Sequence, residues 1–187
     1  MKIVCLGDSL TDHYNVAPEA CWVSLLNRET PHTWINQGVS GDTSPGLLTR
    51  LQTEVFPQNP DMVLWMGGDN DIMLTGAADL AKACLMAMLH QCTARGIKPV
   101  IGIPIPALDI PQRWKAVCDW EKALAESARY VAWLRHFTAA LSLRRVDFAG
   151  AFEKQGRTLY LPDGMHPSET GHRVMADAVR QSGVFHE

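Results

Sequence analysis

The sequence predicts an α/β domain built on a five-stranded parallel sheet, and two observations predict it. Short unbroken apolar runs, such as residues 3–6 and 62–66, are typical of strands buried on both faces. Longer stretches with helical spacing of apolar residues lie between these runs. Strands that alternate with helices form parallel sheets covered by helices. Because domains commonly hold roughly 100–200 residues, we expect one domain over residues 1–187.

Five strands are expected in chain order. The first ends at Gly7, the second at Gly38 and the third at Gly67. The proposed ranges are 3–6, 33–36, 62–66, 99–103 and 145–148.

Apolar residues at helical spacing predict the connecting helices. One lies around residues 22–29, and a second begins at Thr43 or Ser44 and continues to Val55. A third is expected to be capped by Asp79 and to run to Cys92, and the last covers residues 168–181. Residues 112–143 contain no Gly or Pro, and as one helix they would span about 48 Å. Because that exceeds the width of a small domain, we expect a break or a projecting end.

Composition excludes several classes of protein. Hydrophobic residues make up 47% of the chain and charged residues 20%, with a net charge of −3, so a disordered chain is excluded. No basic stripe is present, so we expect no nucleic-acid partner. No apolar window approaches roughly 18 residues, so we expect no stable membrane insertion.

Cysteine usage and the first residues favour a cytoplasmic protein. The five cysteines are odd in number and form no CxxC pair, which is typical of buried, reduced thiols. The apolar run at residues 3–6 is too short for the core of a signal peptide.

Polar and glycine-rich loops follow the predicted strands. In parallel sheets, sites form beyond the carboxyl ends of the strands. The loops in question are residues 7–12, 36–42 and 67–71, together with 163–167 before the last helix. We therefore expect any chemistry at this edge of the sheet.

Ser9 in the first loop is a candidate nucleophile, although alone it would fit a helix cap equally well. A serine nucleophile needs a base, and the base needs a group that orients it. Among the seven histidines, only His166 has an aspartate, Asp163, three residues before it. A carboxylate at that spacing can accept from the imidazole and fix its tautomer.

Candidate donors for an oxyanion lie in three separate loops. Gly41 leaves its backbone N–H unscreened, and Asn70 offers a neutral side-chain donor. The backbone N–H of Ser9 is the third. Each glycine or asparagine alone also fits an ordinary turn, so the combination carries the hypothesis.

The chain resembles the SGNH hydrolases, also called the GDSL family of esterases and lipases. Four motif blocks occur in the order of that family and span nearly the whole chain. They are Gly7-Asp8-Ser9-Leu10, the block from Asn36 to Thr43, Gly68-Asp69-Asn70-Asp71, and Asp163 with His166.

The resemblance implies a flavodoxin-like, three-layer α/β/α sandwich with a five-stranded parallel sheet. It implies that Ser9 is the nucleophile, with His166 as base and then acid and Asp163 as its partner. Ser9, Gly41 and Asn70 would supply the oxyanion donors. The expected reaction is hydrolysis of a small or short-acyl ester through an acyl-enzyme, with no cofactor and no metal.

The chain departs from the usual motifs at two places. His13, followed by Tyr14, stands where the family commonly has glycine, and either side chain could contact the substrate. Asp69 lies beside the oxyanion donor Asn70, where it would point to solvent or else disfavour acidic substrates. Residues 104–120, which include Trp114, could form a wall or lid over the site.

Other functions stay open. Within the same family, the alternative is a thioesterase or lysophospholipase. The aspartates of the loops also suit a metallophosphoesterase, although no D-x-H motif opens the chain. A nucleotide-binding module lacks its G-x-G-x-x-G motif, and a non-catalytic binding module would be expected to lack catalytic identities. The apolar stretch 81–88 could contact a second subunit, so a homo-oligomer is possible.

Overall fold

The computed structural model describes residues 1–153 and 155–185 and contains the predicted sheet. All strand pairs are parallel, and the strand order is β2-β1-β3-β4-β5. The strands are β1 (Lys2–Gly7), β2 (Thr33–Gly38), β3 (Met62–Met66), β4 (Lys98–Ile103) and β5 (Arg144–Asp147). The prediction of a five-stranded parallel sheet is confirmed.

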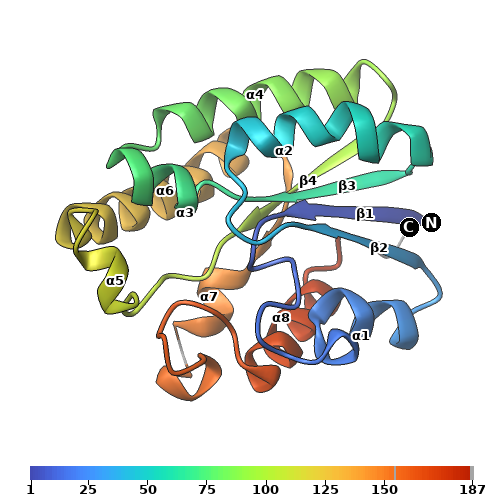
Figure 1. Cartoon of the computed structure of the whole chain (residues 1–187). Coiled ribbons are helices and arrows are strands. Elements are labelled where there is room, and N and C mark those ends of the chain that lie inside the picture. The colour runs from blue at the N-terminus through green and yellow to red at the C-terminus, as the bar shows by residue number, and fades with distance from the viewer. Residues whose placement is uncertain (154, 186–187) are drawn as a thin grey trace.

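Helices cover both faces of the sheet, which gives three layers (Figure 1). One face carries α1 (Trp22–Glu29), α7 (Phe148–Phe152) and α8 (Glu169–Gln181). The other carries α2 (Ser44–Arg50), α3 (Asp69–Thr75), α4 (Asp79–Thr93) and α6 (Trp120–Ala140). The short α5 (Gln112–Lys115) lies at one end of the sheet in Figure 1.

Alternation along the strands divides the apolar side chains between two cores. Ile3 and Cys5 of β1 pack on the side of α1 and α8, whereas Val4 and Leu6 pack on the opposite side. Both faces of β1 and β3 are buried, which explains why these two strands contain unbroken apolar runs rather than alternating polar and apolar residues.

The stretch without Gly or Pro is interrupted, as predicted. It contains α5 and α6, and the side chain of Asp119 caps α6 by accepting a hydrogen bond from the Lys122 backbone N–H at 3.1 Å. The predicted helix to Val55 also changes form, because α2 passes into a wider π-helical turn, η2 (Leu51–Val55). Three 3₁₀ turns complete the described elements: η1 (Pro18–Ala20), η3 (Phe56–Gln58) and η4 (Arg157–Leu159).

Three local predictions are wrong. Phe148, expected in the last strand, opens α7, because the Asp147 carboxylate accepts from the Gly150 backbone N–H and starts a helix there. The loop expected after β3 is largely helical, since α3 begins at Asp69 directly after Gly68 in a left-handed conformation (φ +117°). Asp79 is the first residue of α4 rather than its cap.

Two further observations concern the described residues. None of their helices combines the length and the apolar character needed to cross a bilayer. All five cysteines are free, and all but Cys118 are buried.

Candidate active site

A tight turn after β1 presents Ser9. The backbone carbonyl of Asp8 accepts from the N–H groups of Thr11 (3.1 Å) and Asp12 (3.0 Å), and its carboxylate accepts from Leu10 N–H at 2.9 Å. Gly7 is required at the start, because a Cβ there would lie 2.1 Å from Oγ1 of Thr11. The turn is therefore fixed by its own hydrogen bonds, and it holds Ser9 at the carboxyl edge of the sheet.

Ser9, His166 and Asp163 form a hydrogen-bonded chain. Nε2 of His166 lies 2.9 Å from Oγ of Ser9, and Nδ1 lies 2.7 Å from Oδ2 of Asp163. An ionised carboxylate can only accept, so Nδ1 carries the proton and Nε2 accepts from the serine hydroxyl. The structure thus brings together the three residues that the sequence predicted.

Asp163 is fixed by the turn that carries it. Its Oδ1 accepts from the backbone N–H groups of Met165 (2.9 Å) and His166 (3.1 Å). Burial alone would raise the pKa of Asp163, but these hydrogen bonds and the imidazole together hold it below its ordinary value. The carboxylate is therefore ionised at neutral pH and can orient the ring.

His13 and Tyr14, which depart from the usual family motif, lie in different surroundings. Tyr14 stacks on the imidazole of His166, with 4.0 Å between ring centroids and 29° between planes. His13 has a half-exposed side chain and lies 3.7 Å from the carboxylate of Asp12. Tyr14 therefore belongs to the site, whereas the predicted substrate contact of His13 finds no support in its position.

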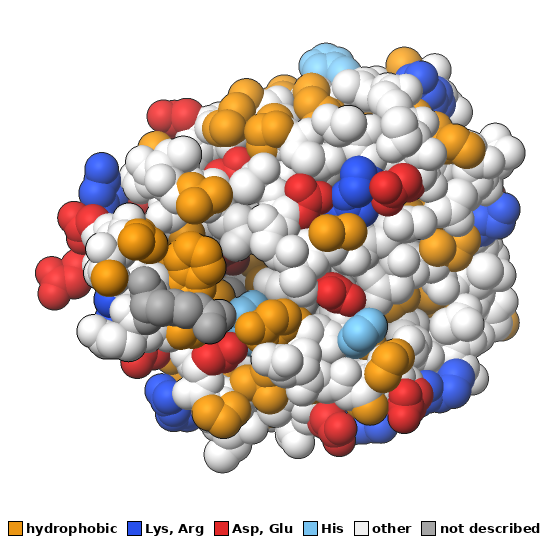
Figure 2. Space-filling view, in the orientation of Figure 1, with side chains coloured by type: hydrophobic (Ala, Val, Ile, Leu, Met, Phe, Trp, Pro, Cys, Tyr) orange, Lys and Arg blue, Asp and Glu red, His pale blue; other side chains and the backbone are white. Residues whose placement is uncertain are grey.

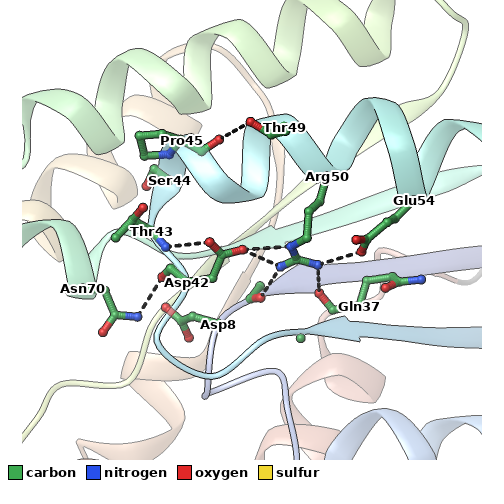
Figure 3. A network of polar contacts seen from close by, with 12 residues as sticks. Asp8, Gln37, Asp42, Thr43, Ser44, Pro45, Thr49, Arg50, Glu54 and Asn70 are labelled. Atoms are coloured by element: carbon green, nitrogen blue, oxygen red, sulfur yellow. Dashed lines mark hydrogen bonds and ion pairs between the residues drawn. The ribbon is translucent and has the colours of Figure 1, made fainter.

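Gly41, on the loop after β2, and Asn70, in the first turn of α3, line the same hollow as Ser9. Gly41 has φ +84°, and a Cβ there would meet nothing within 4 Å, so the space beside this residue is open to a ligand. Nδ2 of Asn70 donates to the Asp42 carbonyl at 2.8 Å (Figure 3). A side-chain amide has two N–H donors, so one is left for a ligand.

Arg50 organises the loop that carries Gly41, and sequence reasoning missed it. Its guanidinium donates to the Asp42 carboxylate (2.8–2.9 Å) and to the backbone carbonyls of Gln37 (2.9 Å) and Gly7 (3.0 Å) (Figure 3). It also pairs with Glu54 one turn further along. Arg50 thus ties the ends of β1 and β2 to the residue that holds Asn70. The signal for this network in the sequence is weak: an aspartate, Asp42, just before the predicted helix and an arginine, Arg50, within it.

Two carboxyl groups beside the serine are destabilised by burial. Burial, with a smaller contribution from neighbouring aspartates, raises the pKa of Asp8 to about 7 and that of Asp69 to about 6. Asp69 accepts from the Ser127 hydroxyl at 3.2 Å. It lines a cavity next to Ser9, so it lies in the site and not in solvent.

A groove of about 400 Å³ opens in front of the serine. Figure 2 shows hydrophobic side chains gathered around this hollow, over α3 and α5. Trp114 is 44% exposed and lies in the wall of the groove, so it is not a core residue. We call this the active-site groove; it is lined by Ser9, Tyr14, Gly41, Asn70, Trp114 and His166, among others.

This arrangement can activate a hydroxyl and receive an anion next to it. A serine hydrogen-bonded to a neutral imidazole, which a carboxylate orients, is the constellation for nucleophilic attack on a carbonyl. Within residues 1–153 and 155–185, no three His, Cys, Asp or Glu side chains converge as a metal-binding cluster would.

Comparison with known proteins points in the same direction. Residues 5–174 match the model of the GDSL-like lipase/acylhydrolase family. An acetylxylan esterase of Geobacillus stearothermophilus is 27% identical over 95% of this chain and 91% of its own length. Thioesterase 1/protease 1/lysophospholipase L1 of Escherichia coli K12 is 31% identical over 56% of this chain and 52% of its own. A solved structure from Desulfitobacterium hafniense DCB-2, classed in the lipolytic G-D-S-L family, has a TM-score of 0.82 at 19% identity, covering 97% and 98% of the two chains.

Proposed function

The chain belongs to the GDSL-like lipase/acylhydrolase family, and we propose that it hydrolyses short-acyl carboxylic esters through an acyl-enzyme intermediate. The observation that carries the proposal is the hydrogen-bonded chain from Ser9 through His166 to Asp163 at the edge of an open groove. The similarity to an acetylxylan esterase over nearly the full chain supports a small acyl group.

In the proposed acylation step, Oγ of Ser9 attacks the ester carbonyl while Nε2 of His166 removes its proton. Asp163 stabilises the imidazolium that forms and keeps the ring in its orientation. The ring then donates this proton to the departing alkoxide, which leaves as an alcohol and yields the acyl-enzyme. Water attacks the acyl-enzyme in the same way, and the carboxylic acid is released.

The negative oxygen of each tetrahedral intermediate is proposed to lie among three donors. These are the backbone N–H groups of Ser9 and Gly41 and the free N–H of the Asn70 side chain. Such donors are fixed before the reaction, so they stabilise the developing charge without reorganisation. The Arg50–Asp42 pair supports this proposal because it anchors the carbonyl to which Asn70 is bound.

Ser9→Ala tests the proposed nucleophile. We expect the rate of p-nitrophenyl acetate hydrolysis to fall by roughly 10⁴-fold or more. Alanine has no hydroxyl that could form an acyl-enzyme, and only the oxyanion donors remain. Labelling by a fluorophosphonate should disappear as well. Ser182→Ala, at the end of α8, is the matched control and should retain both. Wild-type turnover in Ser9→Ala would contradict the proposal.

A thioesterase or lysophospholipase activity is the second candidate. It is favoured by the similarity of about half the chain to the Escherichia coli thioesterase/lysophospholipase. Acyl-coenzyme A and lysophosphatidylcholine, compared with acetate esters at equal concentration, separate the two candidates. A higher kcat/KM on acyl-coenzyme A or on lysophosphatidylcholine than on the acetate esters would favour the thioesterase or lysophospholipase.

A further inference from the structure

Two hollows of very different size meet at Ser9. One is the active-site groove of about 400 Å³, and the other is a cavity of about 30 Å³. We call the second the small cavity; its distinctive lining residues are Asp69, Trp120, Leu124 and Ser127. Ser9, Asn70, Met73 and Met165 line both hollows. An ester bound at Ser9 therefore has two directions in which to place its two halves.

The position of His166 decides which half lies where. The tetrahedral carbon carries Oγ of Ser9, the oxyanion, the acyl substituent and the leaving oxygen. The leaving oxygen must lie within reach of Nε2 of His166, which protonates it. His166 and its stacking partner Tyr14 line the groove but not the small cavity.

We propose that the active-site groove receives the alcohol half of the ester and that the small cavity receives the acyl half. The substrate is then an ester in which an acyl group about the size of acetyl is joined to an alcohol that carries a ring. This inference rests on the proposed function, because it requires attack by Ser9 and proton donation by His166.

The walls of the small cavity limit the acyl group. Its volume of about 30 Å³ is less than a tenth of the 400 Å³ of the active-site groove, so it can hold only the smaller half of an ester. Trp120 and Leu124 project from successive turns of α6 and close it. The Asp69 carboxyl, bonded to Ser127, would be an unfavourable neighbour for a long alkyl chain. The small cavity therefore favours a short acyl group, because a long chain would have to displace Trp120 or Leu124.

The walls of the groove fit a flat ring with an apolar face. Tyr14 and Trp114 supply aromatic surfaces, which stack on such rings. Leu74 of α3 is 67% exposed and Val117 is 73% exposed at the edge of the same groove. Apolar side chains gathered in the open around a catalytic serine indicate a ligand-binding surface. Phenols and cyclic sugars share the chemistry that such walls would bind.

Two variants test the two halves separately. Leu124→Ala enlarges the small cavity, and we expect the ratio of kcat/KM for p-nitrophenyl propionate to that for the acetate to rise about tenfold, the lower end of the range for one methylene in a pocket. Trp114→Ala should leave this ratio unchanged. It should instead lower, about fivefold, the preference for ring acetates over ethyl acetate, because a stacking surface is worth about 1 kcal/mol.

Both variants alter residues that are 36–44% exposed, so we expect them to fold. Leu141→Ala, just past the end of α6, is the matched control and should alter neither ratio. The two ring substrates are phenyl acetate and a methyl glycoside acetate. The one whose preference over ethyl acetate falls more in Trp114→Ala shows whether the groove binds a phenol or a cyclic sugar.

The outcomes separate this inference from the proposed function. If Trp114→Ala changes the acyl-length ratio and Leu124→Ala does not, the two halves are reversed. If neither ratio moves, the assignment of both hollows is wrong. In either case, an inactive Ser9→Ala variant would still support the proposed ester hydrolase activity. An active Ser9→Ala variant would instead overturn both the proposed function and this inference.

Discussion

Tyr14 lies against the face of the imidazole that is proposed to gain a positive charge during the reaction. The face of an aromatic ring attracts a cation, and the attraction is worth about 0.5–2 kcal/mol. We therefore expect kcat to fall about tenfold in Tyr14→Ala, whereas Tyr14→Phe should retain most of it. The measurement is kcat and KM on p-nitrophenyl acetate.

The neighbouring His13 provides the control for Tyr14. Its side chain is half-exposed, and its ring lies near Asp12 and does not stack on the His166 imidazole. His13→Ala should therefore keep the wild-type kcat. A role for Tyr14 in substrate binding alone would raise KM and leave kcat unchanged, and that result would contradict the stacking role.

Asp8 makes stability depend on pH in an unusual direction. Its folded-state pKa of about 7 is raised above the ordinary 3.8, mainly because the carboxyl is buried. Between these values the folded state holds a proton that the unfolded state has lost, so stability decreases as pH rises. In Asp8→Asn the amide oxygen can still accept from Leu10, and this pH dependence disappears.

Urea unfolding at several pH values measures the effect of Asp8. From pH 5 to pH 7, the free energy of unfolding of Asp8→Asn relative to wild type should rise by roughly 2 kcal/mol. Asp79→Asn is the matched control, because that side chain is 93% exposed. A constant difference between Asp8→Asn and wild type across this range would mean that Asp8 is ionised throughout.

At the scale of elements, α2 connects the ends of two strands to the loop that carries Gly41. Arg50 lies in the last turn of α2, and its side chain is 12% exposed. It bonds to Gly7 of β1 and Gln37 of β2, and it holds the Asp42 carboxylate in place. The geometry of the proposed oxyanion donors thus depends on a residue that does not itself contact the oxyanion.

Arg50→Met should therefore reduce both stability and turnover. Removing one partner of a buried ion pair costs about 3–5 kcal/mol. We expect kcat to fall by roughly 10²-fold, similar to the loss of one oxyanion donor. Adding Asp42→Asn to Arg50→Met should restore part of the stability but not the turnover. Thermal unfolding and kcat of the two variants decide this, and unchanged turnover in Arg50→Met would show that Asn70 is held without Arg50.

The elements that the sequence predicted correctly are those with a strong local signal. Buried strands such as β3 are unbroken apolar runs, and α8 has one apolar face. α3 was missed because its first turn, Asp69 to Asp71, is polar and follows two glycines. Its helix is stabilised by tertiary contacts, including a hydrogen bond between Asp71 and Ser44.

In the site too, the residues with a strong local signal could be predicted from the sequence. Ser9, Asp163 and His166 stand in short motifs, so their residue types and spacing were informative. Arg50 and Leu124 carry no such signal, because an arginine or an apolar residue on a helix fits many positions equally well. Their positions follow from the packing of α2 and α6 at the edge of the sheet.

At the scale of the whole molecule, the site joins the two ends of the chain. Ser9 follows β1, and His166 lies 157 residues later, before α8. α8 packs against α1 and α7 in the core that also contains Ile3 and Cys5 of β1. The distance between serine and imidazole therefore depends on the packing of this helical layer.

Weakening this layer should lower activity and fold together. Met175→Ala removes a fully buried side chain of α8 and should cost about 2–5 kcal/mol. We expect the urea midpoints for hydrolysis and for far-UV circular dichroism to decrease by the same amount. Met88→Ala, on α4 in the opposite core, removes an equally buried methionine and should move both midpoints in the same way. Activity lost at lower urea only in Met175→Ala would mean that the segment carrying His166 opens on its own, because local units can unfold below the global free energy.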